Sequence, residues 1–374
     1  MPKRVSHPPV FGWRHVSIFL GLTFGLTWLL DLATYLHGGL GAPGTILALQ
    51  LQMLLPAFSA TVLGLFFFRE SPLYRARRAG PGRWFYYYAL VLTLVYLLGV
   101  LGFWWGPASG PLTAVAATAP LVLSFVGLPI LIVLRITAGR EAMARVWLSW
   151  GDWRNWLLFA LGFVAYDVLQ AVLNGWFRLG GATLAPPAVP PGLSALTFAA
   201  LAGVQGVLVA PFLAIVLGFG EEYGWRGYLQ SELLKLGRVR GVTLVGVIWG
   251  AWHWPIILMG FNYPGHPLLG AVLMTLYTTG LAVVLGYAVL RSGSVLLVAY
   301  LHALNDQVVN YLVAMGCRPF DAAFSFGIGV YGLVTLALVA ALILRDPLWR
   351  DKHARPRPDG RVEADVARLI PTVS

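Results

Sequence analysis

Three stretches of the sequence place ionisable side chains inside runs of apolar residues: GFGEEYGWRGYLQ, WGAWHWPIILMG and YLHALNDQVVN. The residues that could do chemistry in them are Glu221, Glu222, Arg226, Trp249, His253, His302, Asn305 and Asp306. Glutamate and histidine commonly act as general acids and bases. An ionisable group inside an apolar span costs on the order of 2.5 to 3.5 kcal/mol, so a cluster of such groups indicates a function.

The first stretch combines an ion pair with a second carboxylate. Glu222 and Arg226 are four residues apart, so on a helix they share a face and can pair, which lowers the cost of burying that carboxylate. Glu221 points about 100° away around the helix. We therefore expect Glu222 to belong to the scaffold and Glu221 to be free for chemistry. An ion pair at a helix end on the membrane surface is the simpler alternative.

The two histidines lie well inside their apolar runs. Asn305 and Asp306 follow His302 by three and four residues, so both lie on its side of a helix. His253 stands between two tryptophans, which an aromatic belt at the membrane surface could explain, although the belt does not explain the histidine. Three polar clusters on three neighbouring spans favour a common site over isolated core histidines.

Two further carboxylates, Asp31 and Asp167, each stand alone in an apolar run. A carboxylate inside a membrane is a functional candidate by default. Neither has a second titratable group at helical spacing, so we expect each to cap a helix break or to bond across helices.

The composition shows that these runs belong to a membrane protein. Apolar residues make up 58% of the 374 residues, charged residues make up 11%, and the mean hydropathy is +0.75. The single cysteine, Cys317, excludes an intrachain disulfide framework and a cysteine metal cage. A bilayer core about 30 Å thick needs roughly 20 apolar helical residues. We expect an all-α, polytopic transmembrane helix bundle with about ten spans, near 15–36, 45–68, 84–105, 112–134, 156–176, 197–222, 241–260, 268–290, 294–316 and 325–344.

The basic residues predict the direction of these spans. With ten spans and both termini cytoplasmic, all of the 26 basic residues except Arg178 and Arg318 fall on the cytoplasmic side. The net charge of +11 is then explained by the cytoplasmic position of the basic residues and by their attraction to anionic membrane lipids. A nucleic-acid partner is not expected. Reporter fusions should be external after Gly110 and Pro191, and internal after Arg78.

The depths of the charged groups predict a broken helix. The run from Thr197 to Leu236 would measure about 60 Å as one helix, twice the bilayer core. It should therefore break or bend, at Pro211 or at the pair Gly218 and Gly220. The expected result is a chamber below the cytoplasmic surface, open to water from that side, with both glutamates at its wall.

The ordered motifs resemble the CPBP family of intramembrane proteases, which includes the type II CAAX prenyl endopeptidases and the bacteriocin-processing or Abi proteins. Glu221, Glu222 and Arg226 match its E-E-x-x-x-R motif, Trp249 and His253 match its aromatic-x-x-x-H motif, and His302 and Asp306 match H-x-x-x-N/D. Aspartate stands where asparagine is usual, with Asn305 beside it as the alternative. The resemblance covers about residues 197–316.

The resemblance implies peptide hydrolysis in the membrane with water as the nucleophile. Glu221 and His253 would hold and deprotonate the water, while His302 and Asp306 or Asn305 stabilise the tetrahedral intermediate. Glu222, Arg226 and Trp249 would support them. No cofactor is favoured. The alternative is zinc on Glu221, His253 and His302, an acceptable set of three ligands, although H-E-x-x-H is absent.

The resulting organisation has an N-terminal extension of about five spans (1–196), a catalytic core (197–316), a last span (317–344) and a basic cytoplasmic tail (345–374). The substrate would be a peptide or a membrane protein, with a prenylated substrate as one option. We expect the protein in the cell membrane of a prokaryote, in contact with membrane lipids. Two alternatives are an inactive immunity-type protein that binds a partner, and a proton-coupled transporter, whose inverted repeat is missing.

Overall fold

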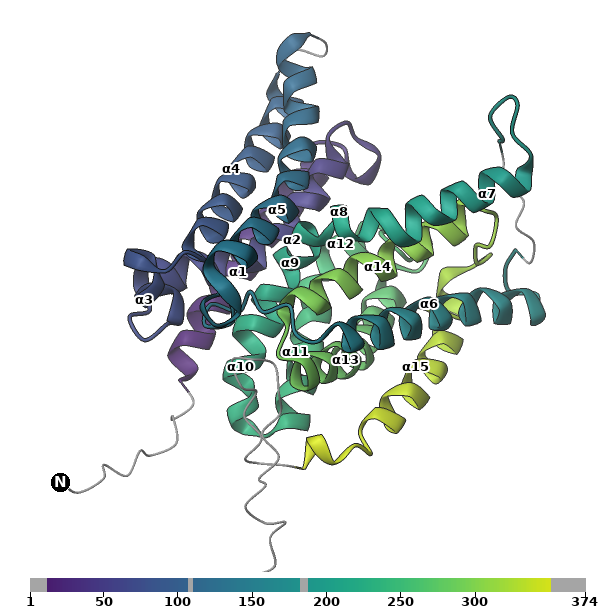
Figure 1. Cartoon of the computed structure of the whole chain (residues 1–374). Coiled ribbons are helices and arrows are strands. Elements are labelled where there is room, and N and C mark those ends of the chain that lie inside the picture. The colour runs from purple at the N-terminus through teal and green to yellow at the C-terminus, as the bar shows by residue number, and fades with distance from the viewer. Residues whose placement is uncertain (1–11, 107–109, 182–187, 351–374) are drawn as a thin grey trace, which may run out of the picture.

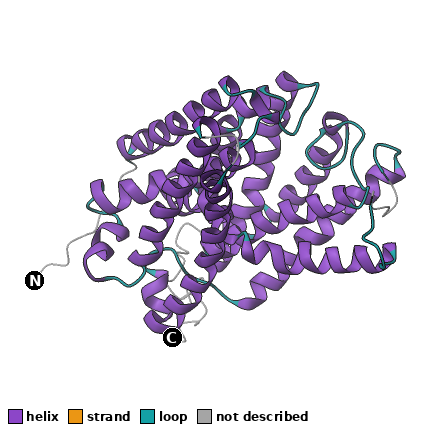
Figure 2. Cartoon of the chain, turned by 90° about the horizontal axis from the view of Figure 1, so that it is seen from above, coloured by secondary structure: helices purple, strands orange, loops and turns teal. Residues whose placement is uncertain are grey.

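The computed structural model describes residues 12–106, 110–181 and 188–350. These residues form helices and no β-strand, and one isolated antiparallel bridge pairs Gly180 with Pro319 (Figure 2). The predicted all-α, polytopic helix bundle is confirmed. Most of the predicted basic tail, residues 351–374, lies outside the described residues, as do Lys3 and Arg4.

The N-terminal part of the bundle is built from long apolar helices joined by short loops. Its helices are α1 (Trp13–Leu36), η1 (Gly39–Gly41), α2 (Thr45–Val62), η2 (Leu63–Phe67), α3 (Pro72–Ala79), α4 (Arg83–Trp105), α5 (Pro111–Ala144) and α6 (Trp153–Trp176). The short helix α3 carries arginines on the loop between α2 and α4, and Ser71 caps it by accepting a hydrogen bond from the backbone N–H of Leu73.

The C-terminal part contains the three motifs and is more interrupted. Its helices are α7 (Ala195–Gly203), η3 (Val204–Val209), α8 (Ala210–Leu213), α9 (Ile215–Glu222), η4 (Tyr223–Leu229), α10 (Gln230–Leu233), η5 (Leu234–Leu236), α11 (Arg238–Trp252), α12 (Trp254–Leu258), α13 (Pro267–Ser292), α14 (Val295–Ala314), η6 (Ala322–Phe324), α15 (Val330–Ile343) and η7 (Pro347–Trp349). Of these, η3 and η4 have π-helical hydrogen bonding, and π turns occur frequently at functional sites.

Among the described residues, seven helical segments are long and apolar enough to cross a membrane. They are Trp13–Leu36, Thr45–Phe67, Arg83–Trp105, Thr113–Ala144, Trp153–Trp176, Ala195–Leu213 and Pro267–Ser292. The apolar helix α15 is shorter, at 14 residues. The chain is therefore an integral, multi-pass membrane protein, while ten spans and two cytoplasmic termini remain predictions.

The predicted break between Thr197 and Leu236 is present, but it lies at Ala214. There the backbone leaves helical geometry, with φ −87° and ψ 1°, between α8 and α9. Pro211 lies three residues earlier, where the missing N–H of proline weakens the helix. Gly218 and Gly220, the other predicted sites, are helical residues of α9. The chain then continues past Glu222 through η4, so the motif does not end a straight helix.

The two glycines serve close packing instead of bending. Helix α9 lies at the centre of the bundle and packs against α2 and α14 (Figure 1). A Cβ at Gly218 would overlap the backbone oxygen of Ala299 on α14, and a Cβ at Gly220 would lie 2.5 Å from the backbone oxygen of Met53 on α2. Small residues allow such backbone approach between membrane helices.

We expect Gly218→Ala to lower the free energy of unfolding by about 2 to 3 kcal/mol, because the overlapped atom is a backbone oxygen that cannot rotate away. Thermal unfolding in lipid nanodiscs would measure the change. Gly162→Ala on α6 is the matched control, since nothing lies within 4 Å of the added Cβ there. Equal melting temperatures for the two variants would contradict this packing.

Candidate active site

The two adjacent glutamates end up inside the protein. Glu221 is 3% exposed and Glu222 is fully buried, both on the last turn of α9. The π-helical segment η4 follows directly and carries Arg226. Because the helix continues through η4 and α10, the glutamates lie in the interior of the bundle and not at a helix end in solvent.

Glu222 is held on two sides. Its Oε1 accepts hydrogen bonds from Nη1 of Arg226 at 2.9 Å and from Nδ1 of His302 at 2.7 Å. The ion pair between Glu222 and Arg226 that the spacing of four residues predicts is therefore present. Both of its charged side chains are fully buried. Charge-assisted bonds of this kind are shorter and stronger than neutral ones. Glu222 thus joins η4 to α14 and fixes the ring of His302.

The positive charge of Arg226 is met by Glu222 and by an aromatic face. Its guanidinium carbon lies 4.1 Å from the ring centroid of Trp249, a cation–π distance. Its Nε and Nη2 are buried without a hydrogen-bond partner among the described residues. A change that removes Glu222 would therefore leave a buried arginine with one aromatic contact only.

Trp249 links Glu221 to His253. Its indole N–H donates a 2.8 Å hydrogen bond to Oε2 of Glu221. Its backbone oxygen lies 2.8 Å from Nδ1 of His253. A carbonyl oxygen only accepts, so Nδ1 of His253 carries the hydrogen and Nε2 is left with a lone pair in the neutral ring. The same reasoning applies to His302, whose Nδ1 meets the carboxylate of Glu222.

The second ring nitrogen of His302 faces two other carboxylates. Nε2 lies 3.9 Å from Oε1 of Glu221 and 3.7 Å from Oδ2 of Asp306. Both distances are too long for a direct hydrogen bond, and a separation of more than 3.5 Å is one that a water can bridge. Asn305 donates to Oδ1 of Asp306 at 3.4 Å, so the two candidates for the third motif act on one another.

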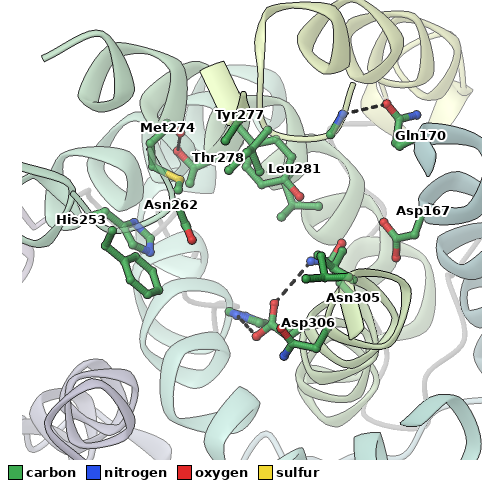
Figure 3. A pocket seen from close by; sticks show the side chains of 18 of the residues that line it. Asp167, Gln170, His253, Asn262, Met274, Tyr277, Thr278, Leu281, Asn305 and Asp306 are labelled. Atoms are coloured by element: carbon green, nitrogen blue, oxygen red, sulfur yellow. Dashed lines mark hydrogen bonds and ion pairs between the residues drawn. The ribbon is translucent and has the colours of Figure 1, made fainter. Parts of the chain in front are cut away.

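All of these groups except Glu222 and Arg226 line one cavity of about 510 Å³. Glu221, Trp249, His253, His302, Asn305 and Asp306 contribute to its wall. Figure 3 shows His253 on one side of the cavity, Asp167 on the other, and Asn305 and Asp306 between them. The structure thus brings Glu221 and His302 close together, whereas His253 shares their cavity and reaches Glu221 through Trp249.

The predicted N-terminal extension supplies part of this wall. Gln52 and Met53 of α2 line the cavity, as do Asp167, Gln170 and Asn174 of α6. Asp167, for which a structural role is expected because it has no titratable partner at helical spacing, also lines the cavity. Gln170 and Asn174 follow Asp167 by three and seven residues, so the three side chains lie on one face of α6. This polar face is the feature of the sequence that would have indicated a place in the cavity wall. Asp31 is buried on α1 and does not line the cavity.

The cavity lies at one end of the bundle. Its wall includes Asn262 after α12, Cys317 after α14 and the segment 325–328 before α15. The arginine-rich loops between α2 and α4 and around α10 lie at the opposite end of the same helices (Figure 1). The predicted topology places the loops after α12 and α14 outside, and the side on which the cavity opens stays a prediction.

The described residues contain no group of three or more His, Cys, Asp or Glu side chains arranged to hold a metal ion. The alternative zinc set depends on Glu221, His253 and His302, and only Glu221 and His302 come within 4 Å of each other in the described structure. Among the described residues, the zinc alternative therefore has no ready-made three-ligand arrangement.

Comparison with known families agrees with this site. Residues 203–308 match the family described as Type II CAAX prenyl endopeptidase Rce1-like. The match spans all three motifs and confirms the resemblance predicted from them. No curated protein and no solved structure matched the chain.

Proposed function

We propose that the protein is an intramembrane endopeptidase in which Glu221 activates a water for attack on a peptide bond. The observation that carries this proposal is the buried carboxylate of Glu221, held by the Trp249 indole at 2.8 Å and facing the imidazole of His302 at 3.9 Å on the wall of a cavity. A carboxylate in that position can accept a proton from a water in the gap. The match to CAAX-type proteases supports the same reaction.

The proposed reaction uses the cavity groups in two steps. Glu221 takes a proton from the water, oriented by the free Nε2 of neutral His253, while the water oxygen bonds to the scissile carbonyl carbon. Protonated His302 and the amide of Asn305 donate to the resulting oxyanion. Glu221 then returns the proton to the leaving nitrogen as the carbon–nitrogen bond breaks. Asp306 orients Asn305, which donates to it at 3.4 Å, and it acts on His302 through a water, for which their separation of 3.7 Å leaves room.

A peptidase assay with the purified, full-length protein tests this proposal. Wild-type protein in nanodiscs should cleave quenched fluorogenic peptides, and Glu221→Ala should not. Activity that survives a strong zinc chelator supports the glutamate-type scheme, whereas loss that added zinc restores supports the metal alternative. Peptide binding without any cleavage would instead support the alternative of an inactive protein that binds a partner. Peptidomics of membranes with and without active protein would identify the substrate, including a prenylated one.

The cavity supports a chamber that opens away from the arginine-rich loops. If those loops are cytoplasmic, the chamber faces the other side of the membrane. The one native cysteine, Cys317, lines this end of the cavity and is partly exposed. We expect a membrane-impermeant maleimide added to intact cells to label Cys317.

The matched control is Cys317→Ser combined with Arg75→Cys, which moves the thiol to an exposed position of α3. This variant should react only after the cells are permeabilised. Labelling of Cys317 from the same side as position 75 would overturn the assignment of the cavity to the opposite face and restore the cytoplasmic chamber.

A further inference from the structure

Asp167 is a buried carboxylate without a partner in the described structure. It is 5% exposed, and its Oδ2 is buried and accepts no hydrogen bond from any described residue. A buried carboxyl is costly as an anion unless it takes up a proton or a compensating group reaches it. Asp167 lies on α6, outside the segment 203–308 that matches the protease family.

The neighbouring polar residues of α6 make hydrogen bonds to other parts of the protein, whereas Asp167 makes none in the described structure. Gln170 accepts hydrogen bonds from the backbone N–H of Gly327 and the hydroxyl of Thr335. Asn174 donates to the backbone oxygen of Phe326 and accepts from its N–H. These two amides hold the segment before α15 in place. Asp167, on the same face, is left directed at the cavity.

The surroundings of Asp167 favour a positive charge. Figure 3 shows its carboxylate facing the turn of α14 that carries Asn305 and Asp306. Among the described residues that line the cavity, Asp167, Glu221 and Asp306 are acidic, His253 and His302 are the basic ones, and none is lysine or arginine. Aromatic side chains, including Tyr166 and Tyr277, complete this part of the wall, and aromatic faces also attract cations.

We propose that Asp167 is a specificity-determining residue that binds a cationic side chain, lysine or arginine, of the peptide substrate. This inference rests on the proposed peptidase function and adds the substrate class: an apolar peptide segment with a basic residue near the cleaved bond. The apolar wall accepts the segment, and Asp167 with Asp306 accepts the charge. The cationic group supplies the hydrogen-bond donors that Oδ2 of Asp167 lacks.

The test uses full-length protein in nanodiscs and an apolar peptide series in which one position at a time is lysine or the neutral norleucine. Wild-type protein should prefer lysine at one position. Asp167→Asn should lower kcat/KM for that lysine peptide by about 10- to 100-fold, the range for hydrogen bonds to charged groups. Cleavage of the norleucine peptide should change less than about threefold, and Asp167→Glu should restore part of the preference.

Asp31→Asn is the matched control, because Asp31 is also a buried aspartate with an unpartnered Oδ2 but lies outside the cavity. It should leave the lysine preference unchanged. An equal loss for both peptides in Asp167→Asn would show a structural role and overturn the proposal, as would an unchanged preference.

Binding separates this proposal from the proposed catalysis. Fluorescence anisotropy of the same peptides on Glu221→Gln protein reports recognition without any cleavage. A lysine preference in binding that disappears with Asp167→Asn supports the cationic subsite even if no peptide is hydrolysed. Equal binding of lysine and norleucine peptides, or binding of neither, overturns it.

Discussion

Glu221→Gln is expected to lower kcat/KM for peptide hydrolysis by about 10³-fold, within the range for removal of a general base. Glutamine has the shape of glutamate and can keep the 2.8 Å hydrogen bond from the Trp249 indole through its amide oxygen. It cannot accept a proton from water at neutral pH. Folding should therefore be retained while the chemical step is lost, which a fluorogenic peptide assay and a melting curve measured together would show.

Glu232→Gln is the matched control for the loss of a carboxylate. Glu232 lies outside the cavity and pairs with Lys235 on the surface of the bundle. It should keep both activity and stability close to those of the wild type. A Glu221→Gln protein with more than about a tenth of wild-type activity would contradict the assignment of Glu221 as the base, and attention would turn to Asp306 and Asp167.

Local spacing was enough to predict part of this site. The Glu222–Arg226 pair follows from four-residue spacing on one helix, and it is formed in the structure. The helical, membrane-embedded fold follows from long apolar runs, because a bilayer leaves few alternatives for the backbone. Both are properties of single segments and need no knowledge of how the segments pack.

Relations between segments could not be predicted in the same way. No spacing indicates that Glu222 accepts a hydrogen bond from His302, which lies 80 residues away. Gly218 was expected to bend its helix, yet it is needed because α14 comes into backbone contact there. The break falls at Ala214, three residues after Pro211, whose missing N–H weakens the helix there. Such features depend on which helices become neighbours.

The place of Asp167 in the cavity wall was missed for a related reason. An isolated aspartate in an apolar run has no partner in sequence, and its neighbours Asn305 and Asp306 belong to α14. The cytoplasmic chamber was inferred from the depths of the charged groups together with an expected helix break, and its side stays a prediction. The wall of the cavity also includes residues of α2 and α6, which lie far from the motifs in the sequence.

The second large effect is expected for Glu222→Gln. Oε1 of Glu222 is shared between Arg226 and His302 at 2.9 and 2.7 Å, and all three side chains are largely buried. Loss of its charge removes the hydrogen-bonded counterion of the Arg226 guanidinium, and breaking a buried ion pair in this way destabilises by about 3 to 5 kcal/mol. A fall in melting temperature in nanodiscs would measure this, together with loss of peptidase activity.

The double variant Glu222→Gln, Arg226→Met separates stability from catalysis. Methionine removes the unpaired charge and fills much of the same volume beside Trp249, so the melting temperature should recover most of what the single variant loses. Activity should stay about 10²-fold below wild type, because the imidazole of His302 no longer has a carboxylate to fix its position, and small displacements of a catalytic group have effects of that size. Recovery of both properties would mean that Glu222 serves only to neutralise Arg226, and that His302 is oriented by Asp306 alone.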